Sequence, residues 1–180
     1  MNEQKIALVT GANRGIEYAI AQGLLDANFQ VIIGSRTIEK GIAAAEKLNS
    51  PLVSAVELDI ADDNSINKVF NELKVKIDRL DVLINNAGIY PDNGFNILTI
   101  DRDLLTKTLN VNTFGAIKTT QIFLSLLEKA VDPGWVSSDM GGENAPRTVE
   151  RGADTAVWLA TVDSVEDSGK LWRDHSVVSF

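Results

Sequence analysis

The chain has 180 residues, of which 44% are hydrophobic and 23% are charged, and this composition is typical of a globular protein rather than a disordered one. The length suits one domain, so we expect residues 1–180 to form a single domain. A formal net charge of −8 argues against a general nucleic-acid surface. The absence of cysteine excludes disulfides, thiolate catalysis and cysteine-based zinc sites.

Membrane and metal sites are not expected either. No apolar run is long enough to cross a bilayer, and the start of the chain lacks the pattern of a secretory signal. Asp62 and Asp63 stand at a predicted helix start, where acidic residues favour the helix dipole, so we assign them no metal. We expect a cytoplasmic protein with no membrane contact.

Predicted strands and helices alternate along the chain. Short apolar runs predict strands at 5–10, 30–35, 51–60 and 79–88. Apolar residues at helical spacing predict helices from Ile16 to Leu24, over 37–48, along the face that carries Ile66 to Ile77, from about 101 to 130, and over 148–161. Apolar strands between amphipathic helices indicate an α/β fold with a parallel sheet covered on both faces.

The most informative motif is "VTGANRGIEYAI", residues 9–20, where a strand passes through glycines into a helix. A helix N-terminus presents backbone N–H groups and a positive dipole end to a phosphate. Gly11 permits a tight turn, and Gly15 lets the chain approach a ligand closely. The motif therefore predicts a mononucleotide or dinucleotide site, although its spacing is not that of the commonest dinucleotide fingerprint.

Several motifs resemble the short-chain dehydrogenase/reductases, in particular their carbonyl-reductase-like branch. They are "TGANRGI", "LDI" at 58–60, "NNAG" at 85–88, "LNVNTFGA" at 109–116 and "DPGWVSSDMGG" at 132–142, and the tail at 145–173 is similar too. The resemblance implies a Rossmann-like, doubly wound parallel sheet. It also implies an NADP(H)-dependent oxidoreductase that acts on small carbonyl compounds or alcohols.

The resemblance also implies which residues bind the cofactor. The expected cofactor-binding residues are Gly11, Asn13, Arg14, Gly15, Ile16, Arg36, Asp59, Ile60, Asn85, Ala87, Gly88, Pro133, Gly134 and Val136. Among them, Asp59 is expected to meet the adenine amino group. Asn112 matches the residue that kinks a helix and helps to hold a proton-relay water, and Ser138 matches a hydroxyl residue beside the nicotinamide.

The end of the second predicted strand bears on the choice of cofactor. A carboxylate there would bind the ribose hydroxyl of NAD, but this chain has Gly34, Ser35 and Arg36. Arg14 and Arg36 are suited to charge-assisted contacts with a 2′-phosphate, and the less favoured alternative is that both are exposed surface arginines. We expect NADP(H) to be preferred over NAD(H).

Glu17 departs from the resemblance, because the family motif has its third glycine at this position. A carboxylate near a diphosphate would weaken cofactor binding by about one to two decades, from like-charge repulsion of roughly 3 kcal/mol before screening. The alternative is that Glu17 points to water and stabilises the helix N-terminus.

The proton donor of the family is a second departure. The family reaction uses a Ser and a Tyr with a Lys four positions later, so that one helix face carries both. The two tyrosines here are Tyr18, followed at that spacing by Gln22, and Tyr90, followed by Gly94. We therefore infer that the Ser and Tyr-x-x-x-Lys segment is deleted and that turnover is low or absent.

The deletion would also truncate the fold. Only 20 residues separate Asn112 from Pro133, fewer than the roughly 30 of a strand–helix–strand unit. We expect four βα units followed by a C-terminal helix and strand, with one edge of the fourth strand uncovered. Residues 169–174 or a second chain could cover that edge.

Three functional hypotheses follow. The first is an NADP(H)-dependent oxidoreductase of small carbonyl or alcohol substrates with little turnover. The second is a catalytically inactive nucleotide-binding or interaction protein, and the third is a non-functional deletion product. A homo-oligomer stays open in each, and no nucleic-acid partner is expected. The lone His175 is interpreted as a surface residue.

Overall fold

The computed structural model of the chain describes residues 4–13, 15–91, 98–131, 148–162, 172–173 and 175–177. Its centre is a five-stranded sheet in the order β3-β2-β1-β4-β5, and every pairing in it is parallel. The strands are β1 (Ile6–Thr10), β2 (Gln30–Ser35), β3 (Val53–Glu57), β4 (Leu80–Ile84) and β5 (Leu127–Val131). This arrangement confirms the predicted α/β, Rossmann-like fold.

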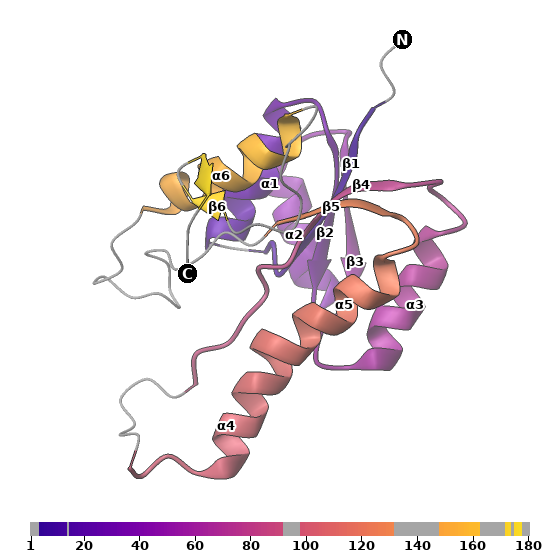
Figure 1. Ribbon diagram of the computed structural model, residues 1–180. Coiled ribbons are helices and arrows are strands. Elements are labelled where there is room, and N and C mark those ends of the chain that lie inside the picture. The colour runs from indigo at the N-terminus through magenta and orange to yellow at the C-terminus, as the bar shows by residue number, and fades with distance from the viewer. Residues whose placement is uncertain are drawn as a thin grey trace.

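Helices cover both faces of the sheet (Figure 1). One core joins the sheet to α1 (Gly15–Asp26), α2 (Ile38–Leu48) and α6 (Val149–Thr161). The other core joins it to α3 (Asp63–Leu73) and α5 (Ala116–Phe123). Before α5, the helix α4 (Arg102–Leu109) and the π-helical segment η1 (Asn110–Gly115) continue one after the other. No helix among the described ranges is long and apolar enough to cross a membrane.

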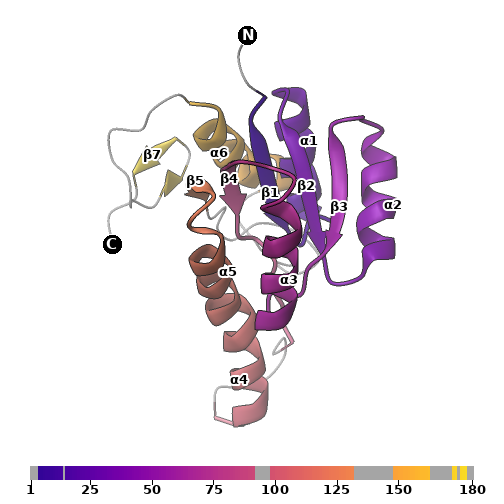
Figure 2. The same ribbon diagram turned by 90° about the vertical axis from the view of Figure 1, so that its right-hand side faces the viewer.

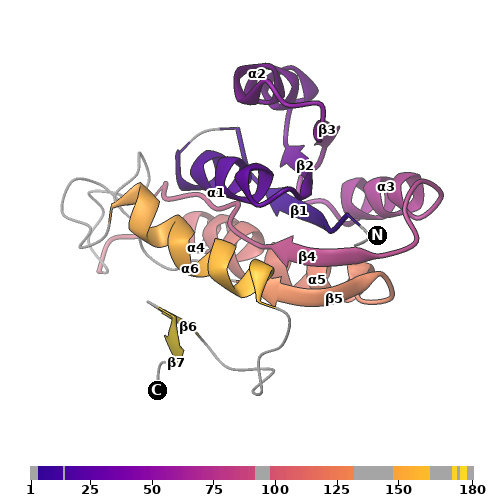
Figure 3. The same ribbon diagram turned by 90° about the horizontal axis from the view of Figure 1, so that it is seen from above.

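The helices α1 and α6 lie side by side on the sheet, as Figure 3 shows from above. Gly23 of α1 makes this close approach possible, because a Cβ atom there would lie 2.8 Å from Val157 Cγ2. Thr148 caps the start of α6 by accepting from the N–H of Arg151 at 3.2 Å. Backbone and Thr148 hydrogen bonds to the Glu150 carboxylate lower the pKa of this exposed group.

A buried carboxylate ties the amino ends of β1 and β4 together. Asp81 is 5% exposed, and its Oδ2 atom accepts from the Ile6 N–H at 2.7 Å. Its other oxygen pairs with Arg79 Nε at 3.0 Å. The negative charge is thus satisfied within the protein, as burial of a carboxylate requires.

The long helix predicted from 101 to 130 is wrong at its C-terminal end. The helix α5 ends at Phe123, and residues 127–131 form β5, which pairs along β4 from Leu80 to Ile84. The expected uncovered edge of the fourth strand is therefore also wrong, since β5 provides the fifth strand position. The strand predicted over 51–60 is shorter, at Val53–Glu57.

The C-terminal residues do not pair with β4 in the described part of the chain. Instead β6 (Trp172–Arg173) and β7 (Ser176–Val177) form a separate antiparallel pair. His175 between them takes a positive φ of 60°, pairs with Asp154 at 2.7 Å and stacks on Trp158 with a centroid distance of 4.6 Å. His175 lies on the surface, as the sequence indicates, and holds this strand pair against α6.

Candidate functional site

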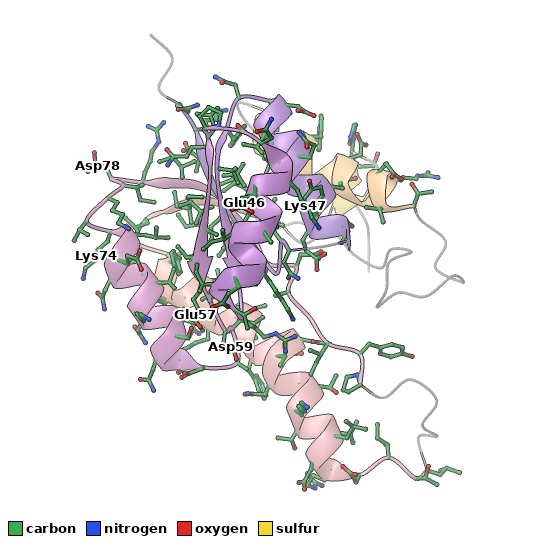
Figure 4. All side chains as sticks on the ribbon, turned by 180° about the vertical axis from the view of Figure 1, so that it is seen from behind. Glu46, Lys47, Glu57, Asp59, Lys74 and Asp78 are labelled. Carbon is green, nitrogen blue, oxygen red and sulfur yellow. The ribbon has the colours of Figure 1, made fainter. Side chains whose placement is uncertain are left out.

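A cavity of about 570 Å³ opens at the carboxyl ends of β1, β2, β3 and β4. It is lined by Gly11, Asn13, Gly15, Glu17, Ser35, Arg36, Thr37, Lys40, Leu58, Asp59, Ile60, Ala87, Gly88, Ile89 and Val111. Figure 4 shows Asp59 at this end of the sheet and Lys74 and Asp78 at the other. Open α/β sheets bind ligands beyond the carboxyl ends of their strands, where the strand order reverses, and here that point lies between β1 and β4.

Thr10 fixes the turn that forms one wall of the cavity. Its hydroxyl is buried at the end of β1 and donates to the carbonyl of Ile84 at 3.2 Å. The same oxygen accepts from the N–H groups of Asn86 and Ala87 at 3.1 and 3.0 Å. The turn after β4 is therefore held against β1, which places Ala87 and Gly88 at the cavity.

The loop between β1 and α1 requires its two glycines. Gly11 and Gly15 have φ angles of +82° and +66°, a region that disfavours side chains. A Cβ atom on Gly11 would also lie 3.0 Å from Ala87 Cα, so the β1 and β4 turns approach each other closely. The loop leads into α1, whose N-terminus lies at the cavity and brings the positive end of the helix dipole there.

Basic and hydroxyl side chains gather at the end of β2. Arg36 and Lys40, four residues apart, are both exposed and both line the cavity, together with Ser35 and Thr37. Sequence reasoning identified Arg36 but missed Lys40, because a lysine in the first turns of an amphipathic helix is most often a solvated residue. The helical i, i+4 rule gave no signal for the pair, because Arg36 precedes Thr37, the extended N-cap residue of α2.

Asp59 is held by its own loop at the end of β3. Its Oδ1 atom accepts from the N–H of Ala61 at 2.9 Å, and its N–H donates to Ser65 Oγ at 3.0 Å. The side chain is thus oriented before any ligand binds. As a carboxylate it can accept from an N–H group of a ligand.

Glu17 lies at the cavity and not in the solvent. It is 9% exposed in the first turn of α1 and lines the same wall as Gly15. The interpretation that it points to water is therefore wrong. A carboxylate at this wall disfavours an anionic ligand, although its place at a helix N-terminus is favourable for the fold.

Asn112 sits in the π-helical segment η1, which interrupts the regular helix between α4 and α5. Its side chain pairs with the backbone of Ile89 in both directions, accepting from the N–H at 2.8 Å and donating to the carbonyl at 2.7 Å. Gly115 brings η1 close to the end of β3, because a Cβ atom there would lie 2.5 Å from the carbonyl oxygen of Ile60. Both contacts position residues that line the cavity.

The structure brings eight of the predicted cofactor-binding residues to one cavity. They are Gly11, Asn13, Gly15, Arg36, Asp59, Ile60, Ala87 and Gly88. Two others lie elsewhere: Ile16 is buried in the core, and Asn85 donates from Nδ2 to Thr120 Oγ1 at 2.9 Å. Arg14, Pro133, Gly134, Val136 and Ser138 lie outside the described residues.

The described lining residues fit the adenosine and diphosphate parts of a dinucleotide. The two glycines of the loop take backbone conformations that disfavour side chains, and the N-terminus of α1 lies at the same cavity. Cationic groups stand at the β2 end and a carboxylate at the β3 end. Among the residues the structure describes, no group of three His, Asp or Glu side chains could hold a metal ion.

Comparison with known proteins agrees with this geometry. The family model for short chain dehydrogenases matches residues 5–149. The chain belongs to the short-chain dehydrogenase family. The chain is 38% identical over 135 residues to the 3-oxoacyl-(acyl-carrier-protein) reductase FabG of Aquifex aeolicus, an alignment that covers 73% of this chain and 52% of the relative.

Two further relatives extend the comparison. The (+)-neomenthol dehydrogenase of Arabidopsis thaliana is 31% identical over 161 residues, covering 76% of this chain and 54% of the relative. A solved Pseudomonas aeruginosa RhlG/NADP active-site complex is 27% identical, with a TM-score of 0.67, over 86% of this chain and 64% of that one. The chain thus spans about half the length of these two curated relatives.

Proposed function

We propose that this chain binds NADP(H) in the cavity at the carboxyl ends of its strands and is an oxidoreductase of small carbonyl or alcohol substrates with low turnover. The proposal rests on one observation: the glycine loop, Arg36, Lys40 and Asp59 all line the same cavity. Membership of an oxidoreductase family supports the reaction class. The RhlG complex with NADP, a relative of the same fold, supports the cofactor.

Each wall of the cavity has its own role in the proposal. The backbone N–H groups at the start of α1 receive the diphosphate, and the close approach of Gly11 to Ala87 fixes the adjoining wall of the cavity. The carboxylate of Asp59 accepts from the adenine amino group. When bound, the nicotinamide supplies or accepts the hydride.

Arg36 and Lys40 select the phosphorylated cofactor. A 2′-phosphate between two cations gains charge-assisted hydrogen bonds, each worth about 1.5–3 kcal/mol. No carboxylate stands at the end of β2 to bind an unmodified ribose, because Ser35, Arg36 and Thr37 follow one another there. We therefore expect NADP(H) to bind about 10- to 100-fold more tightly than NAD(H).

Low turnover follows from the sequence of the chain. Neither Tyr18 nor Tyr90 has a lysine four residues later, so no tyrosine has the helical ammonium neighbour that lowers its pKa in the family reaction. General acid catalysis contributes about 10²- to 10⁴-fold to a rate. We propose that the rate of carbonyl reduction lies below the family's by a factor of this order.

A fluorescence titration tests the cofactor assignment. NADPH and NADH are titrated into the wild-type chain and into Arg36→Ala and Lys40→Ala variants, with Lys47→Ala at the far end of α2 as the matched control. We expect Arg36→Ala and Lys40→Ala to weaken NADPH binding by about tenfold or more and to leave NADH binding within about twofold. Equal affinity of the wild-type chain for both cofactors would exclude the proposed selectivity.

Turnover is measured on the same preparations with a panel of aldehydes and ketones. We expect slow oxidation of NADPH that requires the carbonyl compound. A rate typical of well-evolved enzymes, at or above about 10 s⁻¹, would contradict the missing proton donor. Tight NADPH binding with no turnover on any carbonyl would instead remove the oxidoreductase part of the proposal and leave a nucleotide-binding protein.

A further inference from the structure

The π-helical segment η1 packs against the turn between β3 and α3, the turn that carries Asp59. Figure 2 shows α5, which continues from η1, beside α3. Asn110 and Gly115 stand at the two ends of η1, five residues apart. In a regular α-helix, at about 100° per residue, this spacing would turn them about 140° away from each other. The π-helix has a five-residue hydrogen-bond repeat, so its wider turn brings both residues to the same side.

Asn110 and Gly115 contact consecutive carbonyl groups of that turn. A Cβ atom on Gly115 would lie 2.5 Å from the carbonyl oxygen of Ile60. Asn110 Nδ2 donates to the carbonyl of Ala61 at 3.4 Å. The carbonyl of Gly115 is itself held, because it accepts from the buried Thr119 hydroxyl at 2.7 Å. The close approach of η1 to the turn therefore depends on the absence of a side chain at position 115.

The carbonyl that faces Gly115 belongs to the same peptide group as the N–H that holds Asp59. The carbonyl of Ile60 and the N–H of Ala61 share one peptide bond, and this N–H donates to Asp59 Oδ1 at 2.9 Å. A peptide group is planar and stiff, so a displacement of its oxygen also moves its N–H. The orientation of the Asp59 carboxylate at the cavity thus depends on contacts made by Gly115 and Asn110, neither of which lines the cavity.

We propose that Gly115 and Asn110 are positioning residues that orient the Asp59 carboxylate toward the amino group of a bound adenine. The inference rests on the proposed function, because it places the adenosine end of the cofactor at Asp59, and it adds how the site distinguishes adenine from other purines. A hydrogen bond weakens steeply when its angle departs from linearity. A rotation of the peptide group between Ile60 and Ala61 therefore lowers the preference for the amino group without closing the cavity.

The preference is measured by titrating the chain with NADPH and with its hypoxanthine analogue, in which a carbonyl oxygen replaces the adenine amino group. We expect the wild-type chain to bind NADPH about tenfold more tightly or better, because the analogue presents an acceptor to the Asp59 carboxylate. Gly115→Ala should reduce this ratio to about twofold or less by weakening NADPH binding alone. Asn110→Ala, at an exposed position, should reduce the ratio by about threefold.

Gly23→Ala is the matched control for a crowded glycine away from the cavity. Its new Cβ would lie 2.8 Å from Val157 Cγ2, between α1 and α6. This variant should lower the melting temperature and leave the ratio of the two affinities unchanged. The double variant Asp59→Ala/Gly115→Ala should have the same ratio as Asp59→Ala alone, because a residue that acts through Asp59 has no further effect once the carboxylate is gone.

The ratio of the two affinities also separates this inference from the proposed function. An unchanged ratio in Gly115→Ala would overturn the inference and leave cofactor binding intact. If circular dichroism shows that Gly115→Ala does not fold, an unchanged ratio in Asn110→Ala would overturn it instead. Equal wild-type affinities for both ligands would overturn it as well, since Asp59 would then not bind the amino group. A folded wild-type chain that binds neither ligand would refute the proposed function and this inference with it.

Discussion

At the scale of single residues, Glu17 is the side chain that most opposes the proposed cofactor. It is almost completely buried at the cavity wall, where a carboxylate about 6 Å from a diphosphate oxygen would cost roughly 3 kcal/mol at an effective dielectric constant near 20. We expect Glu17→Gly to tighten NADPH binding by about 10- to 100-fold, measured by calorimetry. Glu17→Gln keeps the size and removes the charge, so it should recover most of this gain; no gain in either variant would show that the charge is compensated within the protein.

Asp81 is a buried residue whose replacement should lower the stability of the fold. Its carboxylate accepts from the Ile6 N–H and pairs with Arg79, and only 5% of it is exposed. Asp81→Ala leaves the partly buried N–H at the first residue of β1 and the Arg79 side chain without the carboxylate, so we expect the free energy of unfolding to fall by about 1–3 kcal/mol in urea denaturation. Asp78→Ala, at an exposed position nearby, should change it by less than about 0.5 kcal/mol, and similar losses in both variants would refute this role of Asp81.

At the scale of elements, the packing of α1 on α6 depends on a residue without a side chain. Replacing a helical glycine with alanine normally stabilises a helix by up to about 1 kcal/mol. At Gly23 the new Cβ would lie 2.8 Å from Val157 Cγ2, so we expect Gly23→Ala to lower the melting temperature, at a cost of about 1–3 kcal/mol.

The double variant Gly23→Ala/Val157→Ala separates the two effects. Removing the Val157 methyl groups takes away the clash, so the double variant should be more stable than the sum of the two single changes predicts. Strict additivity would show that the helices move apart to accommodate the new methyl group.

At the scale of the whole molecule, the parallel sheet from β1 to β4 could be predicted from sequence, because each strand is a short β-branched run between glycine or polar turns. The glycine loop and Asp59 could be placed for the same reason, since the carboxyl ends of parallel strands meet at one edge. The strand β5 could not. Its sequence, Leu-Glu-Lys-Ala-Val, contains three residues that are poor in strands and continues the helical spacing of α5.

What makes these five residues a strand is a partner far away in sequence. The edge of β4 lies more than 40 residues earlier, and its unpaired N–H and C=O groups are satisfied by β5. Lys40 escaped prediction for a related reason, because its role depends on the cavity that β2, β3 and the glycine loop form together. Local sequence patterns predict the helices and the strands β1 to β4. Contacts between residues far apart in sequence determine which strand covers the edge of β4 and that Lys40 lines the cavity.

The central claim is that the nucleotide binds at the carboxyl ends of the strands, and amide chemical-shift mapping of the ¹⁵N-labelled chain with NADP⁺ tests it most directly. The account predicts shifts at Gly11, Gly15, Arg36, Asp59 and Gly88, and none at Lys74 and Asp78 at the opposite end of the sheet. Shifts centred on that opposite end, or no shifts at millimolar NADP⁺ in a folded sample, would contradict it.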